Sequence, residues 1–174
     1  LIGAARAAHK LIVVDPKMAD LSVYADVDIL TPNLQELSKY AETSLTDIDT
    51  IGATATRLAK THGIGTIITT LSARGILASS TNGIQFHDQA KTRDVFDVSG
   101  AGDTVVAVIS AAIASGAHLE AAVALANLAA GVAVSKSGTA IVTPGEILAY
   151  MPLSNPLTEP ASLASLCQNW RSAG

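Results

Sequence analysis

The sequence has few of the residues on which several kinds of protein function depend. It has one cysteine, so it closes no intrachain disulfide, and no Cys/His cluster has the spacing of zinc ligands. Aromatic residues make up 3% of the chain, which argues against a stacking platform for nucleic acid. Eleven Lys+Arg against fifteen Asp+Glu give a net charge of −4, whereas a non-specific nucleic-acid binder needs the opposite balance. We therefore expect no nucleic-acid partner and a reducing, cytoplasmic setting.

Long apolar runs are also absent. The longest uncharged stretch, residues 104–119, has sixteen residues, is rich in alanine and falls short of the about 20 strongly apolar residues that span a membrane. The first ten residues have the pattern of an amphipathic helix and not of a signal peptide, and the first residue is Leu1 instead of Met. We expect no membrane span, and a chain that begins inside a larger protein.

The 174 residues fit the roughly 100–200 residues of one domain, and 49% of them are hydrophobic, which is enough for a sizeable core. Apolar β-branched runs predict strands and apolar residues at helical spacing predict helices. The expected strands are 11–15, 28–30, 66–70, 75–79 and 84–87, and the expected helices are 1–10, 33–42, 47–62, 101–115 and 118–135. An Asn-Gly pair predicts a hairpin between the last two strands. Because strands alternate with helices, we expect an α/β fold with a mostly parallel sheet.

The motif with the clearest chemistry is Asp97-Val-Ser-Gly-Ala-Gly-Asp-Thr104, which directly precedes an expected helix. Its glycines allow a tight turn, so that the N–H groups of Gly100, Ala101 and Gly102 point at one spot and form an anion site. A carboxylate beside a phosphate site opposes binding, and Asp103 makes sense there if it removes a proton from an attacking hydroxyl. Alternatively, Asp103 only stabilises the helix N-terminus, by roughly 0.3–1 kcal/mol.

In its strand-to-helix context this octapeptide resembles the signature of the ribokinase-like (PfkB) carbohydrate kinases. Thr31-Pro-Asn-Leu-Gln-Glu36 resembles the Asn-x-x-Glu motif of that family, which implies that Asn33 and Glu36 organise Mg²⁺ and the ATP phosphates. The same pair also fits a helix capping box. Thr70-Leu-Ser-Ala-Arg-Gly75 resembles the nucleotide segment of the family and implies that it binds ATP, with Ser72 in place of the usual glycine.

Two more segments agree with the resemblance. Asn127 lies on an apolar helical face, and the family has an asparagine here near adenine; a core asparagine bonded to backbone is the alternative. The segment 135–139 resembles a loop that holds a monovalent cation through its carbonyl groups, and an ordinary polar turn explains it almost as well. The cation residues implied by the resemblance are Asp97, Ser99, Ala133, Lys136 and Gly138.

Within the superfamily the chain is similar to the kinase domains of the bifunctional heptose kinase/adenylyltransferases of lipopolysaccharide core synthesis, through Val14-Asp-Pro-Lys17, Thr31-Pro-Asn-Leu34, Ser72 and Val98. This resemblance implies that Lys17 faces a phosphate group; a solvated loop lysine is the alternative. After Lys17 the chain has Met-Ala-Asp where that subfamily has Gly-x-Asp, so the substrate stays open. The ending 168–174 is similar to the approach to the nucleotidyltransferase domain of that subfamily.

The resemblance covers residues 1–150 and matches only the C-terminal, ATP-binding half of a three-layer α/β/α kinase fold, with the N-terminal part of the fold absent. It implies ATP, Mg²⁺ and K⁺ as cofactors, a homodimer, and 151–174 as a linker toward a fused nucleotidyltransferase domain. The implied substrate is D-glycero-D-manno-heptose 7-phosphate, phosphorylated at C1. Because phosphoryl transfer needs both reactants held in line, we do not expect this half alone to be active.

Three other functions stay open from the sequence. One is another PfkB kinase, acting on a fructose phosphate, ribose or a nucleoside, and a second is a non-catalytic nucleotide-binding module. A dinucleotide-binding oxidoreductase is the third, although Gly100-Ala-Gly102 lacks the third glycine of that fingerprint. The histidines are scattered without ligand spacing, Cys167 has no general base nearby, and no serine lies in a Gly-x-Ser-x-Gly elbow.

Overall fold

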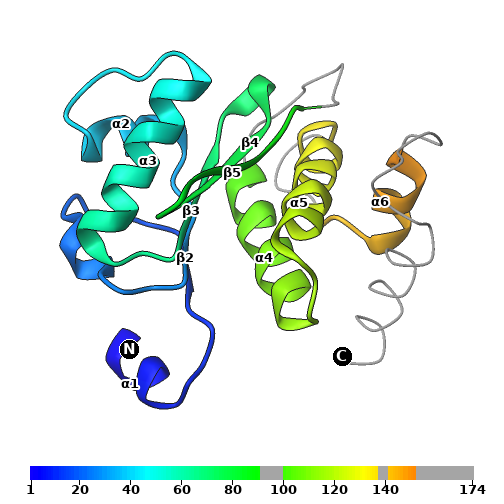
Figure 1. The fold of residues 1–174 in the computed structure, drawn as a ribbon. Coiled ribbons are helices and arrows are strands. Elements are labelled where there is room, and N and C mark those ends of the chain that lie inside the picture. Colours follow the sequence, from blue (N-terminus) through cyan, green and yellow to red (C-terminus); the bar gives the residue numbers. More distant parts are fainter. Residues whose placement is uncertain (91–99, 137–140, 152–174) are drawn as a thin grey trace. The chain divides into compact units, whose positions relative to one another are not determined.

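A computed structural model describes residues 1–90, 100–136 and 141–151 (Figure 1). The chain divides into two compact units, residues 1–89 and 90–174, and each is described by itself. The predicted site residues Asp97, Ser99 and Gly138, together with Val98 and the linker from residue 152 onward, lie outside the described residues.

The first unit is built on a five-stranded sheet in the order β1-β2-β3-β4-β5. Its strands are β1 (Val13–Val14), β2 (Ile29–Leu30), β3 (Thr66–Thr70), β4 (Ile76–Ser80) and β5 (Gly83–Asp88). Its helices are α1 (Ile2–Ala7), α2 (Leu34–Tyr40) and α3 (Ile48–His62), with the short 3₁₀ segments η1 (Leu21–Tyr24) and η2 (Ser72–Arg74). The expected elements of this unit are present, and the two 3₁₀ segments are additional.

The expected mostly parallel sheet is wrong, because the sheet is mixed. β1, β2 and β3 pair in parallel, whereas β3, β4 and β5 pair antiparallel. The hairpin predicted from the Asn-Gly pair is confirmed, but its turn consists of Thr81 and Asn82, because Gly83 already pairs with Ser80 as the first residue of β5. A turn this short joins only antiparallel strands, since a parallel crossover needs about a dozen residues. The hairpin therefore makes the sheet mixed.

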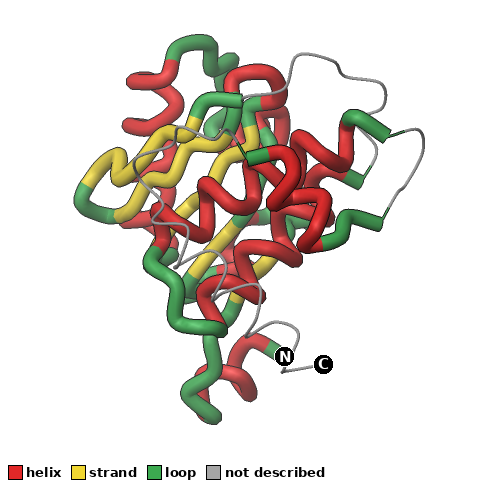
Figure 2. The backbone as a smooth tube through the Cα atoms, turned by 90° about the vertical axis from the view of Figure 1, so that its right-hand side faces the viewer, coloured by secondary structure: helices red, strands yellow, loops and turns green. Residues whose placement is uncertain are grey.

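Helix α3 covers one face of this sheet and supplies much of the core (Figure 1), and the strands of the sheet are yellow in Figure 2. It begins at the N-cap Asp47, whose side chain accepts a hydrogen bond from Thr50 N, and ends at Gly63 in the left-handed conformation, φ 66°. Its apolar stripe packs with residues of the strands and loops. The core residues contributed by α3 are Ile51, Ala55, Leu58 and Ala59, and those of the central strands are Leu30, Ile67 and Leu77.

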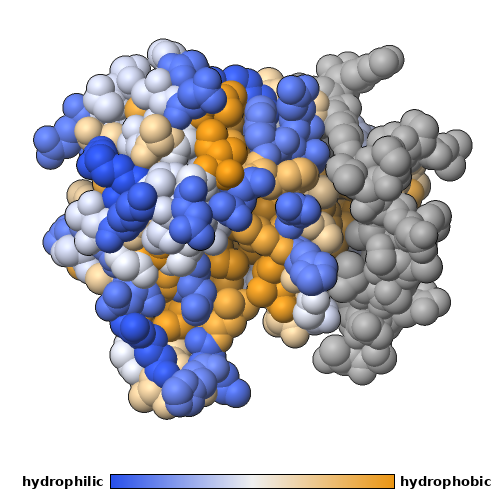
Figure 3. Space-filling model, viewed as in Figure 1, coloured by the Kyte–Doolittle hydropathy of each residue, from blue (hydrophilic) through white to orange (hydrophobic). Residues whose placement is uncertain are grey.

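The second unit contains α4 (Ala101–Ala114), α5 (Leu119–Val134) and α6 (Pro144–Tyr150). Helices α4 and α5 pack against each other, and small buried residues such as Ala112, Ala122 and Ala126 allow their backbones to approach. Figure 3 shows hydrophobic residues gathered where α4 lies, as its uncharged sequence after Asp103 predicts. No described helix is both long and apolar enough to cross a membrane.

Helix α6 was not predicted, although its sequence carries a start signal. Thr143 and Glu146 form a capping box, with Pro144 at the first helical position. Ile147 is buried and α6 packs against α5. With seven residues the helix is too short for a clear apolar period, so the capping residues were the only local sign of it.

Gly65 gives a test of the close approach between β2 and β3. A Cβ added there would lie 2.6 Å from the carbonyl oxygen of Asp28, a backbone atom that also accepts from Thr66 N. We expect Gly65→Ala to lower the free energy of unfolding by about 1–3 kcal/mol, because the strand pair must shift.

Gly3→Ala is the matched control, since a Cβ at Gly3 in α1 meets nothing within 4 Å. It should leave stability unchanged or raise it by up to about 1 kcal/mol. Urea unfolding of both variants measures the difference, and equal midpoints would contradict the close approach.

Candidate functional site

The carboxyl ends of β1, β2 and β3 meet at one edge of the sheet, and three predicted segments lie there. Thr31 donates to the carbonyl oxygen of Val14 through its N–H at 2.9 Å and its Oγ1 at 3.2 Å. Thr70 N donates to the carbonyl oxygen of Pro32 at 3.1 Å, and Asn33 forms an isolated parallel bridge with Thr70. In open α/β sheets this edge is where ligands bind.

Asn33 and Glu36 form the capping box of α2. Glu36 N donates to Asn33 Oδ1 at 2.9 Å, and Asn33 N donates to Glu36 Oε2 at 2.8 Å. The capping alternative raised by the sequence is therefore confirmed. It leaves the ligand role open, because Asn33 is exposed and the box uses only one carboxylate oxygen of Glu36.

The segment after β3 turns sharply within the predicted nucleotide motif. Ser72 has a φ of 53° and Gly75 a φ of 89°. Leu71 N donates to Gly75 O at 2.8 Å, and Gly75 N donates to Ser72 O at 3.0 Å. The left-handed conformation costs a residue with a Cβ roughly 1–2 kcal/mol, which is a physical reason for a glycine at position 72 of the motif. This chain adopts the same turn with serine.

Lys17 lies in the loop after β1, and its neighbours were not predicted from the sequence. Its Nζ lies 2.6 Å from Asp15 Oδ2, and the side chain of Lys17 is 72% exposed whereas that of Asp15 is 24% exposed. Two tyrosine hydroxyls also contact this loop, those of Tyr24 and Tyr40. No local signal marks these partners, because Tyr40 is 22 residues from the residue that it contacts.

Burial raises the pKa of Tyr40 to about 12, and the negative charges of Glu36 and Asp15 nearby add to the shift, as does Tyr24. The carboxylates of the β1 loop and of α2 therefore act on the same phenol. These oxygen atoms are the ligand type that Mg²⁺ prefers. Within the described residues no three His, Cys, Asp or Glu side chains form a metal cluster by themselves.

The first turn of α4 holds the second group of predicted residues. Gly100 is its N-cap in the left-handed conformation, φ 79°, and Thr104 donates to Gly100 O through its N–H at 3.0 Å and its Oγ1 at 2.9 Å. Gly100 has no side chain to cap the first-turn N–H groups, which lack acceptors within a helix. Gly102 and Asp103 are exposed. This turn presents N–H donors and one carboxylate together.

Among the described residues, none lies close enough to Gly102 to require a glycine there. A Cβ added there meets nothing within 4 Å, and glycine in a helix costs roughly 0.5–1 kcal/mol relative to alanine. A residue that weakens its helix and leaves open space fits the close approach of a ligand.

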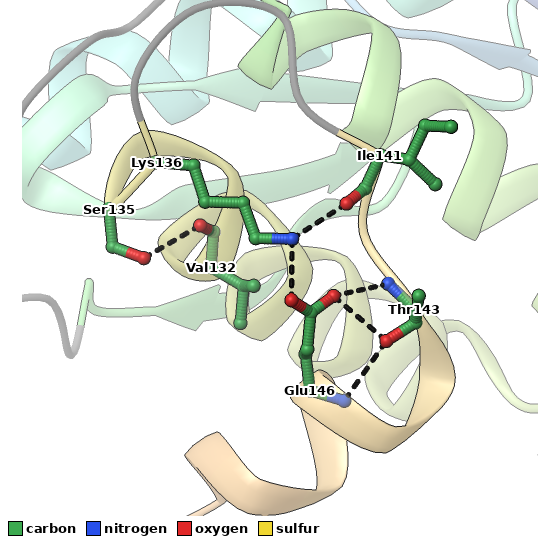
Figure 4. A network of polar contacts seen from close by, with 6 residues as sticks. All are labelled: Val132, Ser135, Lys136, Ile141, Thr143 and Glu146. Carbon is green, nitrogen blue, oxygen red and sulfur yellow. Dashed lines mark hydrogen bonds and ion pairs between the residues drawn. The ribbon is translucent and has the colours of Figure 1, made fainter.

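The other predicted residues of this unit lie on and after α5. Asn127 is 9% exposed in the middle of the helix. Lys136 forms the network of Figure 4, in which its Nζ lies 2.6 Å from Glu146 Oε1 and donates to Ile141 O at 2.7 Å. The hydrogen bond from Lys136, followed by those from Thr143, lowers the pKa of Glu146 to about 2. The carbonyl of Ala133 accepts from Lys136 N at 3.1 Å, and the cation site stays a prediction.

The chain matches the family model described as pfkB family carbohydrate kinase over residues 1–145, and it belongs to that family. Among curated proteins it is similar to the bifunctional protein HldE of Halorhodospira halophila, with 41% identity over 181 residues that cover 100% of this chain and 38% of the relative. The bifunctional protein HldE of Acidiphilium cryptum is 38% identical over 178 residues, which cover 100% of this chain and 36% of the relative.

Solved kinases share the fold. The chain superposes on phosphofructokinase-2 of Escherichia coli in complex with potassium with a TM-score of 0.76 and 20% identity, covering 94% of this chain and 50% of that one. Ribokinase of Arabidopsis thaliana with ribose and ATP gives a TM-score of 0.72 and 22% identity, covering 95% and 50%. The chain thus has a ribokinase-like fold and spans about half of these kinases and less than two-fifths of the HldE relatives.

The pKa of Tyr40 gives a pH test of the β1 loop. The unfolded phenol loses its proton near pH 10 and the folded one near pH 12, so the folded state binds more protons in this window. The contribution of Tyr40 to stability is therefore complete below pH 10 and is lost as the pH rises to 12. Urea unfolding across this window should show a steeper fall for the unmodified chain than for Tyr40→Phe. A Tyr150→Phe control keeps the steep fall, and identical profiles for Tyr40→Phe and the unmodified chain would contradict the assignment.

Proposed function

We propose that this chain is the ATP-binding half of a sugar kinase that transfers the γ-phosphoryl group of Mg-ATP to a sugar hydroxyl. The observation that carries the proposal is the first turn of α4, where N–H donors without a side-chain cap, the exposed Gly102 and the exposed carboxylate of Asp103 occur together. Membership of the pfkB family supports it, as does the span of about half of the ribokinase-like kinases.

In this reaction Asp103 accepts the proton of the sugar hydroxyl. The hydroxyl oxygen forms a bond to the γ-phosphorus while the bond from that phosphorus to the β–γ bridging oxygen breaks, and ADP leaves with the electron pair. The N–H groups of Gly100, Ala101, Gly102 and Asp103 stabilise the charge on the transferred group. One such donor in an anion hole contributes about 2.7–4 kcal/mol in other enzymes.

In this proposal the carboxyl edge of β1–β3 binds the nucleotide. Asn33 and Glu36 hold Mg²⁺ and phosphate oxygens, and Thr70, Ser72 and Gly75 line the nucleotide, with Asn127 near the base. Mg²⁺ would neutralise phosphate charge, and the exposed amide of Asn33 and the half-buried carboxylate of Glu36 offer the oxygen ligands that suit it.

For the acceptor we propose D-glycero-D-manno-heptose 7-phosphate, phosphorylated at C1 as a step of ADP-heptose and lipopolysaccharide core synthesis, with Lys17 facing a phosphate group. The HldE relatives at 38–41% identity and the Val14-Asp-Pro-Lys17 segment support this choice. The same relatives are bifunctional, which supports our proposal that residues 151–174 lead to a nucleotidyltransferase domain.

A monovalent cation and self-association belong to the same proposal. One structural relative is a potassium complex and another is a tetrameric form, both of Escherichia coli phosphofructokinase-2. We propose K⁺ beside α4, held with the help of the carbonyl groups of Ala133 and Lys136, and a homodimer as the assembled form.

Asp103→Asn tests the proton transfer. We expect kcat of the intact protein to fall at least about 100-fold, because a positioned base contributes 10²–10⁴-fold, while Mg-ATP binding stays within about twofold. Glu120→Gln is the matched control, an exposed acid in the first turn of α5, and should keep full turnover. Unchanged turnover in Asp103→Asn would contradict the role of Asp103 as the base. Binding of NAD in place of ATP would contradict the proposed kinase activity.

Gly102→Ala separates stability from turnover at the anion site. We expect the alanine to raise the free energy of unfolding by up to about 1 kcal/mol, since nothing lies within 4 Å of the new Cβ, and to raise the KM for Mg-ATP or lower kcat about 10-fold.

Gly145→Ala is the control for this change. Gly145 occupies the same second position of α6, with equally open space, and its alanine should leave turnover unchanged. Kinetics and urea unfolding of both variants make the comparison, and full turnover of Gly102→Ala would contradict a phosphate at this turn.

A further inference from the structure

The backbone of the β1 loop is held by side chains from outside the loop. Lys17 N and Met18 N both donate to the hydroxyl oxygen of Tyr24, at 2.9 and 2.8 Å. The hydroxyl of Tyr40 donates to the carbonyl oxygen of Met18 at 2.8 Å. Two of the three tyrosines of the chain thus meet at two consecutive residues, of which one is Lys17.

The Tyr24 contact decides how this loop meets an anion. Two successive N–H groups aimed at one point form a small concavity that binds anions, and here the phenol oxygen fills it. Tyr24 is 8% exposed, so its ring is anchored in the core. The backbone donors of Lys17 and Met18 are therefore used internally. The positive charge of the loop is the ammonium group of Lys17, which is paired with Asp15 Oδ2 at 2.6 Å, and its side chain is 72% exposed and can also meet a ligand.

The Tyr40 contact ties the same loop to α2. Tyr40 lies one helical turn after Glu36, so the two side chains share a face of the helix. The helix that carries Asn33 and Glu36 at its start thus also fixes the Lys17 loop near its end. Placement of Lys17 and placement of the Asn33–Glu36 pair depend on one rigid element.

We propose that Tyr24 and Tyr40 are positioning residues, which fix the backbone of Lys17 so that its ammonium group meets a phosphate group of a substrate. This inference rests on the proposed function and adds to it the residues through which Lys17 acts. The bound group is a phosphate monoester or polyphosphate oxygen, from the sugar phosphate or from ATP.

A double-mutant cycle in the intact protein tests the inference. The variants are Tyr24→Phe, Tyr40→Phe, Lys17→Met and the two combinations of a tyrosine change with Lys17→Met, with Tyr150→Phe as the matched control from α6. Calorimetry gives the Kd for Mg-ATP and, separately, for D-glycero-D-manno-heptose 7-phosphate, and kinetics give KM and kcat.

We expect Lys17→Met and Tyr24→Phe each to raise the Kd and KM of one of the two ligands about 10-fold, with kcat changed less than about threefold. The ligand that responds identifies the source of the phosphate. In the Lys17→Met background each tyrosine change should add less than about twofold, because the residue through which the tyrosines act is gone. Tyr150→Phe should change none of these values.

Additive effects of the tyrosine changes in the Lys17→Met background would overturn the inference, since a general loss of structure does not depend on Lys17. Unchanged affinity in both tyrosine variants would overturn it too. Tyr40→Phe guards against misfolding of Tyr24→Phe, because Tyr40 is only partly buried, and circular dichroism checks both. If the protein binds both ligands but transfers no phosphoryl group, the proposed kinase activity is refuted. The Kd values of the double-mutant cycle would then still test whether the tyrosines position Lys17. Binding of neither ligand would overturn both proposals.

Discussion

Parallel pairing of β1, β2 and β3 is the constraint on which the carboxyl-edge site depends. Each parallel pair aligns two residues from each strand, and hydrogen bonds from Thr31 to Val14 O and from Thr70 N to Pro32 O continue the alignment at the strand ends. Because the strands run in the same direction, the segments that follow them leave from one edge. Residues far apart in the sequence, such as Lys17, Asn33 and Thr70, are thereby brought to that edge.

Local chemistry at this edge serves structure first. The Asn33–Glu36 pair caps a helix, and Tyr24 satisfies two backbone donors of a loop. Such bonds hold side chains in place before a ligand arrives, which lowers the entropy cost of binding. A structural role and a ligand-binding role are therefore compatible in the same residue. A hydrogen bond made by one atom of a side chain orients it, and another of its atoms can then bind a ligand.

Two positions depart from the residue that local structure favours. Ser72 adopts a left-handed turn that glycine enters more easily, and Gly102 occupies a helix position that alanine would stabilise. Residues that local stability does not favour are frequent at functional sites, because function there can require a different residue. Among the described residues nothing lies within 4 Å of a Cβ added at Gly102, and our proposal explains this glycine by the close approach of a phosphate group.

Most elements could be predicted from the sequence, because hydrophobic period, caps and turns act over a few residues. The period of α3, its N-cap Asp47 and its end at Gly63 are all local, and so are the capping box of α2 and the glycines before α4. Tertiary structure alone decided the rest. The parallel pairing of β2 with β3 places Ile29 opposite Thr66, and the Lys17 loop depends on Tyr40, 22 residues from its partner. Such contacts form only when packing brings distant segments together, and no local pattern encodes them.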